Sequence, residues 1–261
     1  MNYKLKAFGI ILSVLFSSGC TGTPNRTLSP PADTQWVNVE VKNPSQYTKP
    51  FPLEVRYISH KCLKKRISGV DGSVITEPNY NVINIPLQQG ANDLWKAKVA
   101  MTGGGACEWT LSAFNVGIEY IDAIHLGKDL VPGTAVGATI AFDDDASRNG
   151  KFSLTSGSKL NYTPKYYPFI IRWNEQKNST TPDKLYLFGK ENAFFETRLH
   201  IKPNEDSLIN YRPDIQESKI VEMKFPYEKK KGSTYTYIYP NGEKVLTKDI
   251  NPDFNKLEQM K

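Results

Sequence analysis

The chain has 261 residues, and 39% of them are hydrophobic, which is enough to build a real core. Its formal net charge is +6, and its 33 Lys and Arg are scattered among 27 Asp and Glu. This mild, dispersed balance does not support a nucleic-acid-binding surface, which needs concentrated basic residues.

The N-terminus carries a targeting pattern. A short positive region precedes an apolar run, Ala7 to Phe16, that is too short to span a bilayer. Small residues then lead to Cys20. This order resembles a bacterial lipoprotein signal, which is cleaved before the cysteine, whose thiol then receives a diacylglyceryl group. The alternative is an ordinary cleaved secretory signal followed by an incidental cysteine.

The resemblance implies a signal peptide over residues 1–19 and a lipid anchor at Cys20. Removing residues 1–19 removes two lysines and no acid, so the net charge falls from +6 to +4. Thr21 follows the cysteine, and by the same resemblance the absence of aspartate there favours an outer-membrane protein that faces the periplasm.

Two further cysteines, Cys62 and Cys107, would then lie in a compartment where disulfides persist. A bridge between them closes a loop of about 46 residues, worth on the order of 4 kcal/mol in the chain-entropy model. We expect this disulfide, with two buried free thiols as the alternative. Neither cysteine has the close second ligand that a metal site needs.

Residues 20–35 are rich in Pro, Ser and Thr and are expected to form a flexible tether from the membrane. Order is expected to begin at Trp36. Apolar and polar residues then alternate, as in half-buried strands, over Val37–Val41, Leu53–Tyr57, Ile83–Leu87 and Trp95–Met101. Pro86 places the third of these at a sheet edge, because proline cannot donate to a ladder.

The stretch Gly103–Tyr120, GGGACEWTLSAFNVGIEY, is expected to hold the central strand. Its apolar set changes phase after Ala113, which predicts a bulge or bend near Phe114–Asn115. The order strand, glycine turn, strand predicts that Trp95–Tyr120 forms one hairpin.

Later strands are expected at Thr139–Phe142, Lys151–Leu154, Phe169–Trp173, Lys184–Phe188 and Phe194–Ile201. No long amphipathic helix is evident, and turn residues recur throughout. We therefore predict an all-β fold: an immunoglobulin-like antiparallel β-sandwich over residues 36–202 with a C-terminal β-hairpin extension. The likeness to immunoglobulin domains, in two cysteines and nearby tryptophans, concerns shape only.

Residues 203–261 are expected to form a connector and the C-terminal hairpin region. Asn241-Gly242 lies between two β-prone runs, Thr234–Tyr239 and Glu243–Ile250, and predicts a type I′ turn. Tyr235, Tyr237 and Tyr239 share one face of the first arm. They either pack on the sandwich, or pair with Lys219–Phe225 as a small third sheet, or form a partner-binding surface.

The adjacent run Lys229, Lys230 and Lys231 is either a solvated turn or a patch that steers an acidic partner.

Catalytic motifs are absent from the sequence: it contains no G-x-S-x-G, no H-E-x-x-H and no phosphate-binding glycine loop. His60, His125 and His200 lie far apart along the chain. Asp143-Asp144-Asp145 lacks the spacing of an EF-hand and falls where a strand-connecting loop is expected. We therefore expect no enzyme activity, no cofactor and no metal.

A lipoprotein signal followed by the GGG-A-C-E-W-T-L-S segment and G-I-E-Y resembles small enterobacterial lipoproteins encoded beside type VI secretion lipase effectors. The resemblance rests on Gly103–Tyr120 and the signal, about a fifth of the chain. It implies an immunity protein: a membrane-anchored inhibitor whose partner is an incoming phospholipase, and which needs no chemistry of its own.

Two other functions remain open at this point. An envelope structural or assembly lipoprotein would use the same anchor to bind outer-membrane partners. A hydrolase or carbohydrate-binding module would need a concave cluster of aromatics and carboxylates on the sandwich.

Overall fold

A computed structural model describes residues 24–147, 151–173, 179–191, 193–201, 205–228, 230 and 232–260. The expected signal peptide, Cys20, Lys229 and Lys231 lie outside these ranges. Within them the chain is almost entirely β-structure, which confirms the predicted all-β fold. The one α-helix in the described part is α1, Phe254–Gln259. No helix there has the length and apolar composition needed to cross a bilayer.

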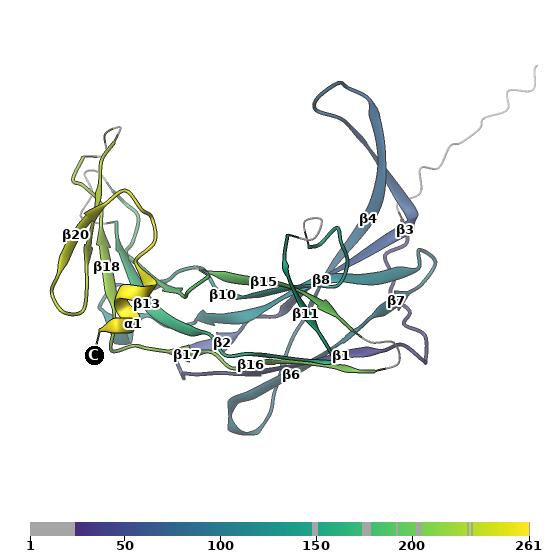
Figure 1. The fold of residues 1–261 in the computed structure, drawn as a ribbon, viewed down its shortest axis with the longest axis horizontal. Coiled ribbons are helices and arrows are strands. Elements are labelled where there is room, and N and C mark those ends of the chain that lie inside the picture. Colours follow the sequence, from purple (N-terminus) through teal and green to yellow (C-terminus); the bar gives the residue numbers. More distant parts are fainter. Residues whose placement is uncertain are drawn as a thin grey trace, which may run out of the picture.

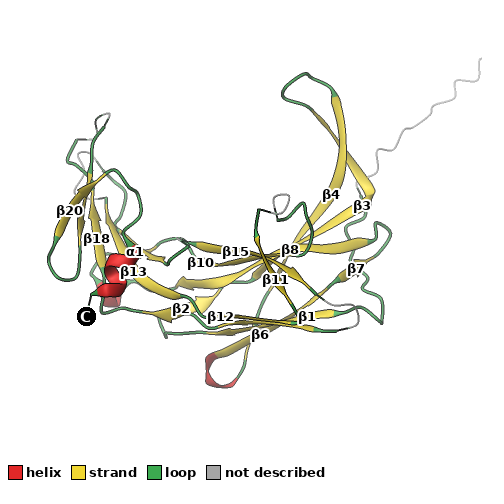
Figure 2. Ribbon diagram, in the orientation of Figure 1, coloured by secondary structure: helices red, strands yellow, loops and turns green. Residues whose placement is uncertain are grey.

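Two sheets pack face to face as a β-sandwich (Figures 1 and 2). The five-stranded sheet runs β12 (Lys159–Tyr162), β16 (Ser207–Tyr211), β1 (Trp36–Lys42), β6 (Leu94–Ala100), β5 (Gln88–Gln89). The eight-stranded sheet runs β11 (Ser153–Ser156), β15 (Phe194–His200), β10 (Val136–Ala141), β8 (Trp109–Tyr120), β3 (Leu53–Ile67), β4 (Val74–Ile85), with β2 (Thr48–Pro50) and β7 (Thr102–Gly104) also paired to β8. Both sheets are mixed, since β16 lies parallel to β1 and β15 parallel to β10.

A third sheet of seven strands stands at one end of the sandwich (Figure 1). Its order is β20 (Lys244–Thr247), β19 (Tyr235–Ile238), β18 (Val221–Lys224), β13 (Lys165–Arg172), β14 (Lys184–Phe188), β9 (Val131–Pro132), with β17 (Asp214–Ile215) paired to β13. Two short 3-10 turns, η1 (Ala91–Asp93) and η2 (Ile124–Leu126), complete the described elements.

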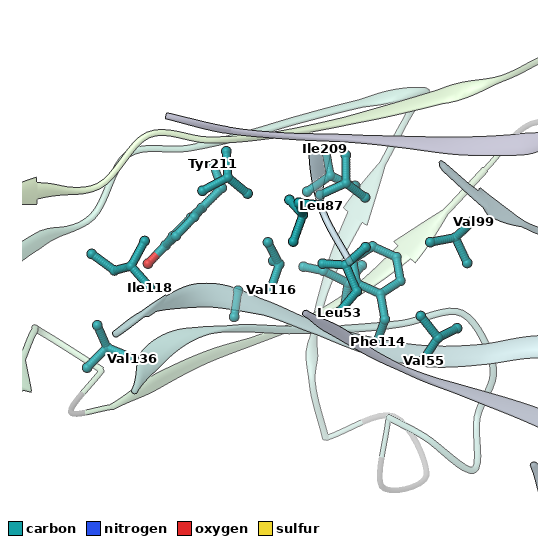
Figure 3. Close-up of a cluster of buried hydrophobic side chains, with 14 of the residues drawn as sticks. Leu53, Val55, Leu87, Val99, Phe114, Val116, Ile118, Val136, Ile209 and Tyr211 are labelled. Carbon is teal, nitrogen blue, oxygen red and sulfur yellow. The ribbon is translucent and has the colours of Figure 1, made fainter. Parts of the chain in front are cut away.

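The sandwich core forms where the alternating strands turn their apolar faces toward each other. Val37, Val39 and Val41 of β1 are fully buried, as the alternation predicts. Figure 3 shows Ile209 and Tyr211 of one sheet facing Val116 and Ile118 of the other. Each aliphatic side chain buried in this way stabilises the fold by about 1.5–3 kcal/mol.

Strand β8 lies at the centre of the eight-stranded sheet, between β10 and β3. Arg56 pairs with Ala113, whereas the next residue, Tyr57, pairs with Leu111, so the extra residue on β8 is Ser112. The bulge expected near Phe114–Asn115 therefore occurs a little earlier in the strand. It moves the core-facing set from Leu111 to Phe114, which is the phase change seen in the sequence.

The prediction that Trp95–Tyr120 forms one hairpin is wrong. β6 pairs with β1 in the five-stranded sheet, while β8 belongs to the other sheet. The chain changes sheets at Met101, and only β7 turns back onto β8. Alternation of apolar residues specifies which face of a strand is buried, but it does not specify the neighbouring strand.

Residues 24–35 are not a free tether, because they pack along the end of the sandwich. The indole Nε1–H of Trp109 donates to the carbonyl oxygen of Asn25 at 3.0 Å. The side-chain amide of Asn81 donates to the carbonyl oxygen of Arg26 at 2.8 Å. These bonds hold the first described residues against β8 and β4.

The three glycines before β8 form the surface on which residues 24–35 pack. The Ser29 amide donates to the Gly103 carbonyl at 2.8 Å. Gly104 and Gly105 have φ of +60° and +72°, and a Cβ on either would lie 2.3 Å or 2.5 Å from a carbonyl oxygen of the segment. Glycine is required here both for the backbone conformation and for the close approach of a second chain segment.

The sheets do not divide at residue 202, where the sandwich was predicted to end. β16, from the expected connector, lies in the sandwich between β12 and β1. β13 and β14, from the expected sandwich range, form the middle of the third sheet. In β16 the apolar residues Leu208, Ile209 and Tyr211 do not alternate regularly with polar ones, and prolines flank the segment, which conceals the strand in the sequence.

Cys62 and Cys107 form the predicted disulfide. The bridge links β3 to the turn between β7 and β8, so both ends belong to one sheet. The immunoglobulin bridge instead joins two sheets.

The predicted C-terminal hairpin is present as β19 and β20. Its turn is not type I′. The Gly242 amide donates to the Tyr239 carbonyl at 2.9 Å, which makes Pro240 the first central residue of the turn. Proline holds φ near −65°, which excludes type I′, and Asn241 does not have the positive φ of a type II turn. The turn is therefore type I, and Gly242 follows with φ of +81° as a bulge.

Candidate functional site

Tyr237 and Tyr239 are buried, with 1% and 4% of their surface exposed. The Tyr237 hydroxyl donates to the Asp249 carbonyl at 3.0 Å, and the Tyr239 hydroxyl accepts from the Asp253 amide at 3.1 Å. Burial raises the pKa of the Tyr237 phenol above its ordinary value. The interpretation of these two residues as a contact surface is therefore wrong, and the alternative, a small third sheet that includes Lys219–Phe225, is the one the structure has.

A short helix explains this burial. α1 lies across one half of the third sheet, with Leu257 fully buried and Phe254 edge-on to Tyr167 at 5.5 Å between ring centroids. Asp253 caps the helix by accepting a hydrogen bond from the Lys256 amide at 3.2 Å. The aromatic face of the sheet is covered along this half.

Aromatic side chains continue past the covered half. β18 pairs Met223 with Tyr237, so Phe225 and Tyr235 are the next residues on the same face. Trp173 follows β13 beside Phe225, because Arg172 pairs with Lys224. We call Trp173, Phe225 and Tyr235, together with Tyr227, the aromatic row.

Three members of the row are in ring contact. The rings of Trp173 and Phe225 lie 4.2 Å apart in a stacked arrangement, and Phe225 meets Tyr235 edge-on at 5.3 Å. These three side chains are half-buried, while Tyr227 is 67% exposed. Large aromatic surface that is rigid, partly exposed and continuous with a core is typical of protein interfaces.

One of the predicted binding residues, Tyr235, belongs to this row. Lys230 is exposed and lies in the segment between β18 and β19, 3.8 Å from the carboxylate of Glu228. The aromatic row therefore shares Tyr235 with the predicted surface. Its other packed members, Trp173 and Phe225, come from the ends of the adjacent strands β13 and β18, in place of Tyr237 and Tyr239.

A partly buried ion group holds these strand ends in place. The Arg172 guanidinium donates to Glu222 at 2.6 Å and to Asp183 at 3.3 Å. The hydrogen bond to Glu222 raises the pKa of Arg172 above its ordinary value. The three side chains tie β13 to β18 and to the residue before β14, directly beside Trp173.

The three histidines lie in different surroundings. His60 and His200 are exposed. His125 stacks on Tyr47 at 3.5 Å between ring centroids and lies 3.2 Å from the Glu217 carboxylate, which also accepts from the Tyr120 hydroxyl at 3.1 Å. These contacts tie the loop after β8 to the turn before β18.

The acidic loop also has structural contacts. Asp143 accepts from the Ala146 amide at 2.6 Å, Asp144 pairs with Arg198, and Asp145 accepts from the Tyr80 hydroxyl. Over the described ranges, no group of three or more His, Cys, Asp or Glu side chains could hold a metal ion.

Two surfaces were not predicted from the sequence. The aromatic row could not be predicted, because its members come from positions 173, 225 and 235, and only the register of the sheet brings these positions together. The second surface is the part of the β3–β4 hairpin that extends beyond the sandwich, where Leu63, Ile67, Val70 and Val74 are exposed. The sequence does contain a signal for it, because the basic run 64–66 lies between Leu63 and Ile67, just before a turn with two glycines.

Comparison of the chain with protein-family models, with curated proteins and with solved structures gave no match.

Proposed function

We propose that the protein is a periplasm-facing lipoprotein that binds a type VI secreted phospholipase and neutralises it. The segment Gly103–Tyr120 and the N-terminal pattern support this proposal by their resemblance to immunity lipoproteins. The disulfide supports an oxidising compartment such as the periplasm. Lipidation of Cys20 and outer-membrane attachment are part of the same proposal.

The observation that carries the proposal is the aromatic row. Trp173, Phe225 and Tyr235 are ordered by stacking and by the neighbouring ion group, so that little side-chain entropy remains to be lost on binding. Trp and Tyr are also the residues that most often dominate the energy of a protein interface. A preorganised surface of this kind suits an inhibitor that blocks an enzyme by covering it.

The test uses the mature chain and the G-x-S-x-G phospholipase that the proposal expects to be encoded by an adjacent gene. Fatty-acid release from a soluble ester substrate is measured as the chain is titrated in. We expect stoichiometric inhibition. Tyr227→Ala/Tyr235→Ala should weaken the complex by about thirtyfold, the size of a hot-spot loss.

Leu246→Ala is the matched control, because Leu246 lies in the same sheet and is 71% exposed, but stands outside the row. It should leave inhibition unchanged. A chain that binds no such lipase, and that crosslinks in cells only to resident envelope proteins, would instead identify a structural or assembly lipoprotein.

A further inference from the structure

The hairpin formed by β3 and β4 extends well beyond the sandwich. β3 pairs with both β4 and β8 as far as Ile58, and residues 60–78, which we call the projecting hairpin, then leave the sheet (Figure 1). Strands rise about 3.3 Å per residue, so the tip stands on the order of 25 Å beyond this base. The hairpin turn is ordered, because the Ser68 amide donates to the Ser73 carbonyl at 2.8 Å.

The base of the projecting hairpin is braced. The register slips between Ser59 and Lys64, and within this irregular stretch Cys62 is bonded to Cys107. The Ser59 hydroxyl donates to the Cys107 carbonyl at 2.5 Å and accepts from the Cys62 amide at 2.9 Å. The hairpin is thus held to the sandwich by a covalent bond and a buried hydroxyl.

The two faces of the projecting hairpin differ. On one face Lys64 and Arg66 both pair with Glu77, at 3.1 Å and 2.8 Å. On the other face Ile67 lies opposite Val74, and Lys65 is the next residue of β3 on that face. Ile67 and Val74 are 73% and 66% exposed.

Val70 lies at the tip and is 97% exposed, and Leu63, near the base, is 52% exposed. The exposed surface is therefore aliphatic, and its charged residues are mainly basic. Residues 60–78 contain four basic side chains, Lys61, Lys64, Lys65 and Arg66, and two acidic ones, Asp71 and Glu77, for a net charge of +2. Lys61 also pairs with Glu108, outside the hairpin, at 2.5 Å.

The chain enters the fold beside the base of this hairpin. Arg26 is bonded to Asn81, and Asn81 is two residues from Asn79, which pairs with Ser59 at the base. The step from Cys20 to Pro24 is four residues, which span at most about 14 Å. An anchor at Cys20, which rests on the proposed function, would hold the hairpin next to a bilayer.

We propose that the projecting hairpin inserts its aliphatic tip into the headgroup region of a bilayer that contains anionic phospholipid. Aliphatic side chains partition into the boundary between headgroups and acyl chains, and Lys and Arg next to them are attracted to anionic headgroups. The composition fits a protein partner less well, because protein interfaces are enriched in aromatic residues and depleted in Lys. The aromatic row, at the other end of the molecule, has that composition.

The test uses the mature chain with Cys20→Ser, so that no acyl group contributes, and with the disulfide formed. Flotation measures its binding to vesicles of phosphatidylcholine with or without phosphatidylglycerol. We expect binding to the anionic vesicles that weakens as salt is added. Ile67→Ser/Val74→Ser should lower the partition coefficient by about tenfold or more, because two aliphatic side chains no longer enter the interface.

Leu154→Ser/Leu246→Ser is the matched control, since both leucines are similarly exposed but lie on β11 and β20. It should leave vesicle binding unchanged. Urea unfolding checks that both double variants stay folded.

The proposal is overturned if the Cys20→Ser chain binds neither kind of vesicle, or if the two double variants lose binding equally. It is also overturned if Ile67→Ser/Val74→Ser weakens inhibition of the lipase on a soluble ester and leaves vesicle binding intact, because the hairpin would then be a protein contact. Failure of lipase inhibition by the unsubstituted chain would refute the proposed function and leave vesicle binding as a separate result.

Discussion

The packing of residues 24–35 on the three glycines predicts that one added methyl group, at Gly104, lowers the free energy of unfolding by a large amount. Gly104→Ala places a Cβ where the Ser29 carbonyl oxygen lies at 2.3 Å, in a residue whose φ is +60°. The left-handed conformation alone costs a non-glycine residue about 1–2 kcal/mol. The clash adds to this cost, because Ser29 must move and its hydrogen bond to Gly103 is lost, at about 1 kcal/mol. We expect a total loss of about 3 kcal/mol in the free energy of unfolding.

Gly72→Ala separates the two contributions. Gly72 has φ of +71°, and a Cβ there meets nothing within 4 Å. It should lose only the conformational part, about 1–2 kcal/mol. Urea unfolding of the two variants measures the difference that belongs to the packing of residues 24–35.

Trypsin supplies the second assay. Cleavage after Arg26 requires residues 24–35 to detach from the sandwich. The Gly104→Ala variant should therefore be cut there much faster than the Gly72→Ala variant. Mass spectrometry of the trimmed chain identifies the site. Equal stability losses in the two variants, together with equal cleavage at Arg26, would refute the role assigned to the glycines.

Three further predictions concern the core and the disulfide. Cys62→Ser should destabilise the protein by about 4 kcal/mol, since the bridge to Cys107 closes a long loop; a midpoint in urea equal to that of the unsubstituted protein would contradict the estimate. Tyr237→Ala should cost about 3–5 kcal/mol as a buried aromatic truncation, whereas Tyr237→Phe should cost only about 1 kcal/mol for the lost hydrogen bond to Asp249; similar losses for both would mean that the ring is not packed. Burial raises the pKa of Tyr57 to about 12 against an unfolded value of about 10. Because the folded state then holds this proton more tightly, stability should be level below about pH 10 and fall as the pH rises from about 10 to 12, and urea midpoints that stay constant across that range would refute it.

The sequence predicted the strands better than their arrangement. Lys184–Phe188 was predicted with the bounds that β14 has, because its leucines and aromatic residues are β-prone and turn residues flank it, Pro182 and Asp183 before and Gly189 after. That β1 lies beside β16, about 170 residues later in the chain, could not be predicted, because alternation identifies a buried face and not a neighbour. For the same reason the third sheet, whose strands come from both sides of residue 202, was divided between two predicted regions.

The candidate site was predicted only in part. The sequence predicts Tyr235 as a contact residue, but it predicts the same for Tyr237, because no pattern in the sequence indicates a helix that covers Tyr237. α1 is only six residues long, which is too short to give a clear helical pattern in the sequence. The three consecutive glycines predict a turn. Their second role, which is to let residues 24–35 approach the backbone closely, depends on a contact between distant parts of the chain that the sequence does not show.

Protection of cells tests the central claim most directly. A strain that makes the adjacent phospholipase with a secretion signal is grown with and without this lipoprotein, and survival and phospholipid turnover in the envelope are measured. We predict that the unsubstituted chain restores growth, that Leu246→Ala also restores it, and that Tyr227→Ala/Tyr235→Ala, present at equal level, protects poorly. Cells that die at the same rate with and without the lipoprotein would contradict the account.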